Sequence, residues 1–152
     1  MLNLIKTDSD NADFKILVKL LDADLAIRDG DDHAFYSQFN KIDLIKHVIV
    51  AYENETPIAC GAIKDYQPGI MEVKRMFTAP EHRGKSAASK ILTALEQWAK
   101  EIGCDKCILE TGKQQSEAIA LYLKCGYRII PNYGQYENIP NSICFEKKLN
   151  TL

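Results

Sequence analysis

One amphipathic helical stretch lies between two short apolar runs in the second half of the chain, and this order restricts the possible folds most strongly. From position 83 onward, apolar residues recur every three or four positions and stop at Gly103, as in a helix with one buried face. The runs before and after it, IMEVKRMFT and KCILET, predict buried strands. A strand, a helix and a strand in this order predict a right-handed parallel crossover, which aims the helix start at the carboxyl end of the sheet.

The remaining periodicity predicts a mixed sheet covered on both faces. Asp10 is the expected cap of a first helix, after which come a short second helix and two strands joined through ENETP. A helix over SEAIALYLKCG and two closing strands end the chain. No repeat or linker divides the 152 residues, so we expect a single domain, 1–152, of the α/β or α+β class. The short elements are expected at 32–39 (helix) and at 47–52, 58–63, 127–130 and 142–148 (strands).

Charge and hydropathy limit the kind of partner. The net charge of −2 argues against general nucleic-acid binding, which leaves a basic surface. No apolar run is long enough to span a bilayer, and MLNLIKTDSD lacks the core of a signal peptide, so a cytoplasmic protein is expected. Positions 74–90 carry five bases and one acid, whereas Asp8 to Asp32 holds eight aspartates and three bases. The two segments are either solvated faces or a divided binding surface.

The five cysteines are an odd number in apolar contexts, which favours reduced, buried thiols over disulfides. Cys104 and Cys107 match C-x-x-C, but a second pair at zinc spacing is missing and the pair precedes a strand instead of opening a helix. We therefore expect no metal site.

The loop TAPEHRGKSAAS is suited to hold an anion, because small residues let a ligand approach the bare amides of a helix start. The letters GKS resemble the end of a P-loop, yet position 79 is alanine where that motif needs glycine, and Pro80 removes an N–H. A nucleotide triphosphatase is thus the weaker alternative.

The same loop resembles the pyrophosphate-binding segment of the GNAT superfamily of N-acetyltransferases, Gln/Arg-x-x-Gly-x-Gly/Ala. It reads Arg83-Gly84-Lys85-Ser86-Ala87-Ala88, with Ser86 where the central glycine is usual. The neighbouring passages EVKRMFTAPEHRGK, LETGKQQSEAIALYLKCGY, YGQY and SICFEKKL are similar to the family as well. The resemblance covers Ile70 to Leu149 and implies a mostly antiparallel sheet with a splayed strand pair for acetyl-CoA.

By this resemblance, main-chain atoms of the third strand grip the pantetheine and polarise the thioester, and amides of the loop bind the pyrophosphate. The expected cofactor-binding residues are Met76, Phe77, Thr78, Arg83, Gly84, Lys85, Ser86, Ala87, Ala88 and Ser89.

The resemblance also implies direct transfer to an amine with side chains as acid and base. Tyr122 stands where the family places an acid for the leaving thiolate, or it is only a core aromatic. Glu72 is the candidate base, with Glu110 next; Glu72 could instead orient a substrate or pair with Arg75. Cys144 is expected to be a buried structural thiol.

The acceptor is a small-molecule or protein amine, and the acidic stretch suggests a positively charged one. The N-terminal helices and the Tyr133 to Tyr136 loop are expected to cover its pocket. A homodimer is common in the superfamily. A non-catalytic domain that binds coenzyme A as a sensor stays an alternative, because Ser86 departs from the motif.

Overall fold

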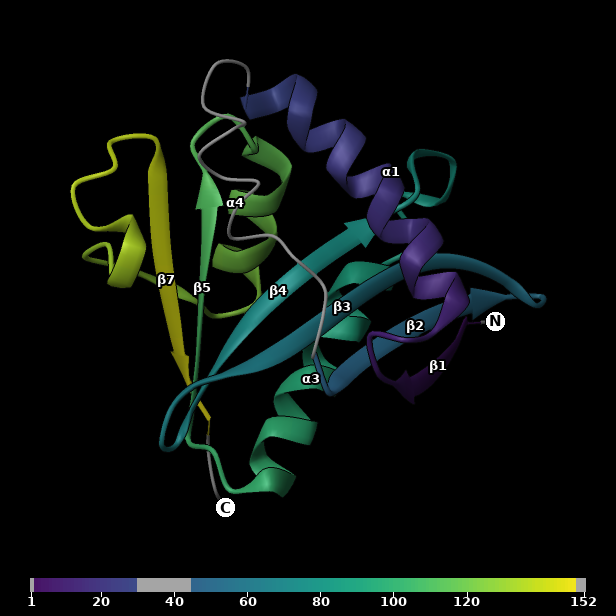
Figure 1. Cartoon of the computed structure of the whole chain (residues 1–152), viewed down its shortest axis with the longest axis horizontal. Helices are drawn as coiled ribbons and strands as arrows, with labels where there is room; N and C mark the ends of the chain where they lie inside the picture. Colours follow the sequence, from purple (N-terminus) through teal and green to yellow (C-terminus); the bar gives the residue numbers. More distant parts are fainter. Residues whose placement is uncertain (1, 30–44, 150–152) are drawn as a thin grey trace.

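The described residues form one seven-stranded sheet with helices on both faces (Figure 1). The computed structural model describes residues 2–29 and 45–149. The strands lie in the order β1-β2-β3-β4-β5-β7-β6, and only β4 and β5 are parallel. This confirms the mixed, mostly antiparallel sheet and the parallel crossover. The strands are β1 (Leu2–Thr7), β2 (His47–Glu53), β3 (Thr56–Gln67), β4 (Ile70–Thr78), β5 (Lys106–Gly112), β6 (Arg128–Ile130) and β7 (Ser142–Lys148).

Two hydrophobic cores lie on opposite faces of this sheet. Helix α1 (Ala12–Asp29) buries Phe14, Leu17 and Val18 against one face, together with Val48 and Phe77. Helices α3 (Ala87–Ile102) and α4 (Ser116–Lys124) cover the other face, where the predicted apolar stripe of α3 is buried. None of the described helices is long and apolar enough to cross a membrane. Two 3-10 turns, η2 (Pro80–His82) and η3 (Gly134–Tyr136), complete the described structure.

Strands β4 and β5 separate soon after they meet. Their pairing is limited to Ile70–Glu72 against Lys106–Ile108, although β4 continues to Thr78 and β5 to Gly112. The two carboxyl ends therefore diverge, as Figure 1 shows, and leave a gap in the hydrogen-bonded sheet where a ligand can reach main-chain groups. This is the splayed strand pair that the resemblance implied.

A β-bulge bends β4 next to this gap. Cys60 pairs with Phe77 and Ala62 with Lys74, so Gly61 faces two residues of β4, Arg75 and Met76. Arg75 has a φ of +61°, a left-handed conformation that costs a non-glycine residue free energy. Its guanidinium, 3% exposed, donates to Asp22 of α1 at 2.9 Å, so an ion pair ties the helix to the bulge.

Three expectations for the N-terminal part need correction or fall outside the description. The chain begins with the edge strand β1, not with a helix, because pairing with β2 supplies a stability that the irregular LNLIKT pattern did not signal. Asn11, not Asp10, caps α1 through a 2.9 Å bond from the Phe14 amide. The helix expected over 32–39 lies outside the described residues.

Side chains of α3 pack closely on Gly61 of β3, so a Gly61→Ala variant should lose stability. A Cβ there would overlap Met76 Sδ and would lie 2.9 Å from Ile91 Cγ2. Such overpacking costs about 1–3 kcal/mol, and urea unfolding measures it. Gln97→Ala on the exposed side of α3 is the control and should change stability little. Equal unfolding midpoints for wild type and Gly61→Ala would contradict this packing.

Candidate active site

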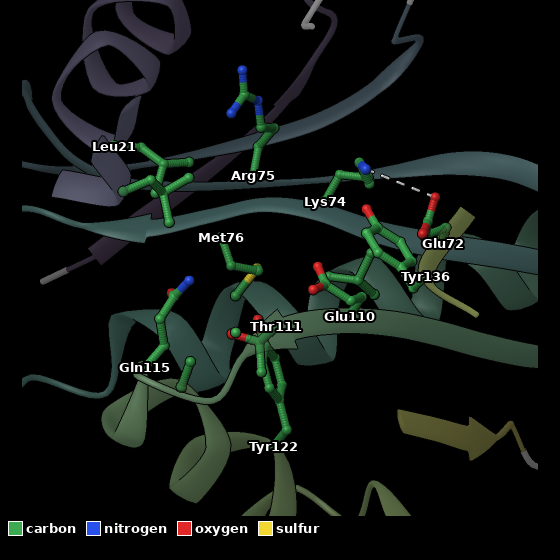
Figure 2. A pocket seen from close by; sticks show the side chains of 14 residues that line it. Leu21, Glu72, Lys74, Arg75, Met76, Glu110, Thr111, Gln115, Tyr122 and Tyr136 are labelled. Atoms are coloured by element: carbon green, nitrogen blue, oxygen red, sulfur yellow. Dashed lines mark ion pairs between the residues drawn. The ribbon is translucent and has the colours of Figure 1, made fainter. Parts of the chain in front are cut away.

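A pocket opens where β4 and β5 diverge (Figure 2). Its walls come from α1, from the bulged part of β4, from the end of β5, from α4 and from the loop after β6. The side chains that point into it are apolar on the α1 side and ionisable along β4 and β5. The lining residues are Leu21, Leu25, Glu72, Val73, Lys74, Arg75, Met76, Glu110, Thr111, Gly112, Gln115, Ala118, Tyr122 and Tyr136.

Glu72 is buried on the pocket side of β4. Its Oε2 accepts a 2.6 Å hydrogen bond from the Tyr133 hydroxyl, and its Oε1 lies 4.0 Å from Lys74 Nζ. The pairing with Arg75 considered from the sequence does not occur, because Arg75 pairs with Asp22. Glu72 and Lys74 are two apart in the regular part of the strand, before the bulge, so they share the face that lines the pocket. Glu72 is thus held in place by a phenol and a cation.

Lys74 shares the pocket with two carboxylates. Its side chain is 11% exposed, and burial lowers the pKa of its ammonium while Glu72 and Glu110 oppose that shift. Glu110 reaches the same pocket from β5. Burying a charged group is costly unless opposite charges surround it, so the three side chains depend on one another.

The Tyr122 side chain packs in the hydrophobic core and also lines the pocket. Its ring centroid lies 5.8 Å from those of Tyr127 and Phe145 within the core under α4. Figure 2 shows the side chain pointing from α4 toward Thr111 and the pocket. Burial, and then the charge of Glu110, raises the pKa of Tyr122 above its ordinary value, so the phenol stays protonated at neutral pH.

The loop between β4 and α3 presents main-chain donors. Gly84 has a φ of +85° and Ser86 a φ of +64°, and a Cβ added at Gly84 would meet no described atom within 4 Å. The Lys90 amide donates to Ser86 O in the first turn of α3, and the amides that precede it at the helix start face outward. Within the described chain the Ser86 side chain makes no capping bond to them. An anion fits this cradle.

The basic side chains of the loop are held by protein oxygens. Arg83 Nε donates to Thr78 O at 3.1 Å, and Lys85 Nζ lies 2.8 Å from Glu53 Oε1. His82 lies beside this pair, with Nδ1 at 3.5 Å from the same carboxylate oxygen. These contacts fix the loop to β2 and to the end of β4, leaving the anion contacts to the backbone.

The structure brings together only part of the predicted site. Glu72, Met76, Glu110 and Tyr122 line one pocket, with Leu21, Leu25 and Tyr136 from the segments expected to cover it. Phe77 points to the α1 side of the sheet, and 83–89 lie outside the lining. Sequence reasoning missed Lys74, and it placed Tyr133 in the covering loop without its hydrogen bond to Glu72. The spacing of two between Glu72 and Lys74 on one strand was the available signal for Lys74.

The thiols belong to the interior. Cys104, Cys107 and Cys144 are buried, and burial raises the pKa of Cys107 to about 12 and that of Cys144 to about 11. Among the described residues, no three His, Cys, Asp or Glu side chains gather as a metal site would need.

A splayed strand pair, a bulged strand beside it and a helix start with outward amides define the fold of acyl-CoA-dependent N-acyltransferases. The chain belongs to the acetyltransferase (GNAT) family, whose model matches residues 15–127. It is therefore an N-acetyltransferase with acetyl-CoA as its donor, and the resemblance seen in the sequence is confirmed.

Relatives and solved structures agree with this assignment. The chain is 39% identical over 102 residues to an IAA acetyltransferase of Azospirillum brasilense, covering 66% of this chain and 67% of that one. A Klebsiella pneumoniae protein provisionally assigned as an acyl-CoA N-acyltransferase has a TM-score of 0.83 and 28% identity, covering 99% of each chain. The PaiA N-acetyltransferase of Thermoplasma acidophilum, solved with coenzyme A, shares the fold with a TM-score of 0.72 and 18% identity, covering 97% of this chain and 99% of that one.

The left-handed loop residues predict opposite effects for two substitutions. Gly84→Ala should lower the free energy of unfolding by about 1 kcal/mol, because a Cβ disfavours this backbone. Ser86→Gly should raise it by up to about 1 kcal/mol, since it removes the same penalty. Thermal unfolding measures both.

Ser89→Gly is the matched control for Ser86→Gly. Ser89 lies in the first turn of α3, where glycine costs roughly 0.5 kcal/mol relative to serine and also removes the 3.1 Å bond from Ser89 Oγ to Ser86 O. If Ser86→Gly and Ser89→Gly destabilised the protein equally, the strain assigned to position 86 would be wrong.

Proposed function

We propose that the chain transfers the acetyl group of acetyl-CoA directly to a primary amine bound in the pocket between β4 and β5. The observation that carries this proposal is the meeting of Glu72, Glu110 and Tyr122 beside the bulge of β4. Direct transfer needs a base near the amine, an acid near the leaving sulfur and a donor for the carbonyl oxygen. One pocket supplies candidates for all three.

The donor substrate would lie along β4 and the following loop. The outward amides of residues 84–89 suit its pyrophosphate, and the main chain of Met76, Phe77 and Thr78 suits its pantetheine arm. Since the pairing of β4 with β5 ends at Glu72, main-chain N–H groups beyond it can polarise the thioester oxygen.

Glu72 is our candidate for the base. It is buried in the pocket and oriented by the Tyr133 hydroxyl, which gives its carboxylate a defined position. A covalent route through Cys144 is disfavoured, because burial raises the pKa of this thiol to about 11 and only the thiolate is a good nucleophile. The amine would thus attack the thioester itself and give up its proton to Glu72, directly or through water.

Tyr122 is our candidate for the acid. A protonated phenol on α4 can give its proton to the departing thiolate of coenzyme A. The raised pKa keeps this proton available throughout the ordinary assay range.

The acceptor would be a small-molecule or protein amine that binds as a cation. Three of the aspartates that suggested this from the sequence have partners within the fold: Asp13 accepts from the Tyr52 hydroxyl, Asp22 pairs with Arg75, and Asp8 accepts from the Asp10 amide. The carboxylates of Glu72 and Glu110 are the better support, because they line the pocket.

The competing candidate is a domain that binds coenzyme A without catalysis, which the Cβ of Ser86 in the loop favours. Release of free thiol from acetyl-CoA, measured over a panel of amines, separates the two. Catalysis requires release that depends on the amine. Binding of coenzyme A by calorimetry without any amine-dependent release would establish the competing candidate instead.

Replacing the proposed acid tests its role. Tyr122→Phe should lower kcat about 10²-fold or more, the usual contribution of a general acid, while coenzyme A affinity stays unchanged. Tyr127→Phe is the control: this phenol is also buried, but it donates to Glu96 outside the pocket. An unchanged kcat in Tyr122→Phe would leave Tyr122 as a core aromatic.

Replacing each carboxylate distinguishes the two candidate bases. Glu72→Gln should lower kcat about 10²-fold or more, because the amine loses its proton acceptor. Glu110→Gln should mainly raise KM for the amine, since we place this carboxylate on the amine as a counter-charge. Steady-state thiol release measures both constants. A larger kcat effect in Glu110→Gln would exchange the two roles.

A further inference from the structure

We propose that the acceptor is a zwitterionic amine, with a carboxylate close to its amino group as in an α-amino acid, and that Lys74 binds this carboxylate. The inference rests on the proposed function and names the substrate class of the same pocket. It starts from a cation that the sequence analysis did not expect at an amine-binding site.

The place of Lys74 in the fold carries the argument. It follows Glu72 by two residues on β4, so both side chains project from the same face of the strand into the pocket. Figure 2 shows the Lys74 side chain extending toward Glu72. Its Nζ lies 4.0 Å from Glu72 Oε1, beyond hydrogen-bond distance, and both side chains are about nine-tenths buried.

A lysine in this place is costly for the folded protein. Burial disfavours the charged ammonium, and its pKa is lowered in spite of two carboxylates. A strand in the middle of a sheet commonly carries apolar residues, whose burial has no desolvation cost of a charged group. Lys74 balances the charges of Glu72 and Glu110, and a ligand carboxylate in the pocket would give the same ammonium a further partner.

The pocket holds charges of both signs. The carboxylates of Glu72 and Glu110 and the ammonium of Lys74 line it together, so a ligand that touches Glu72 is also within reach of Lys74. Arg75 is oriented differently, since its guanidinium turns to Asp22 on α1. A ligand with an ammonium and a carboxylate a few ångströms apart matches this arrangement with both of its charges.

The same arrangement disfavours amines without a carboxylate. A simple ammonium bound to Glu72 would stand close to the Lys74 ammonium and be repelled by it, whereas a zwitterion brings its own counter-charge. The apolar part of the acceptor would face Leu21 and Leu25 of α1, which line the other side of the pocket. Lys74 is thus a specificity-determining residue.

Three matched acceptors test the proposal: L-phenylalanine, L-phenylalaninamide and phenethylamine. They share the apolar group and the amine, but only the first has the carboxylate. We expect kcat/KM, measured by thiol release, to be at least about tenfold higher for phenylalanine, the effect of one charge-assisted contact. The amide is the stricter comparison, because at neutral pH it has the largest fraction of unprotonated, nucleophilic amine of the three.

Variants of Lys74 complete the test. Lys74→Met should raise KM for phenylalanine at least about tenfold and leave KM for the amide unchanged or lower, while Lys74→Arg should keep the preference. Lys124→Met, on the exposed side of α4, is the control for loss of a lysine. Calorimetric binding of coenzyme A shows that each variant is folded and loaded.

The outcomes separate this inference from the function on which it rests. Equal kcat/KM for the acid and the amide, or a Lys74→Met variant that weakens all three acceptors alike, would overturn the zwitterion assignment and leave acetyl transfer intact. The assignment also falls if none of the three reacts while a diamine such as putrescine does. If no amine of any class releases thiol although coenzyme A binds, the proposed transfer itself fails.

Discussion

Hydrogen bonding between β4 and β5 ends after three residue pairs, and the site depends on this early separation. Continued pairing would occupy the donors of β4 and close the pocket. The separation is compatible with a stable sheet because each strand is supported elsewhere, β4 by β3 and β5 by β7 along its whole length. Helix α3 packs across β3 and β4 on the face opposite α1 and buries its apolar stripe there. The outward amides at the start of α3 thus lie close to the end of β4.

The bulge of β4 is the second constraint. An extra residue opposite Gly61 bends the strand, and the left-handed backbone of Arg75 contributes to the conformational free-energy cost of this bend. The ion pair with Asp22 couples this conformation to α1, which also forms the apolar wall of the pocket. Helix α1 therefore links the shape of the acceptor pocket to the shape of the bulged strand β4, along which the donor would lie.

Electrostatics give the pocket its chemical character. Lys74, Glu72 and Glu110 are brought from two strands into one pocket, where both carboxylates favour the charged form of Lys74. In such an environment charge interactions are stronger than in water, so the pocket discriminates between ligands by charge pattern. Family membership fixes the donor and the kind of reaction, whereas these side chains are the basis for our proposal on the acceptor.

The sequence by itself was sufficient to predict the elements with a clear periodicity of apolar residues and the loop with a recognisable motif. The limits of β4 and the end of α3 at Gly103 were predicted, because apolar periodicity and capping glycines are local signals. The family followed from the RGKSAA loop and its neighbours in order.

Only the tertiary structure decided which side chains meet. The edge strand β1 exists through its pairing with β2, and the ion pair between Asp22 and Arg75 joins residues 53 positions apart. The Tyr133 hydroxyl donates to Glu72, which is 61 positions away in the sequence. Lys74 becomes part of a charged cluster only because the fold brings Glu110 of β5 near it. Period and propensity describe neighbours along the chain, while these contacts arise from the packing of segments that are distant in sequence.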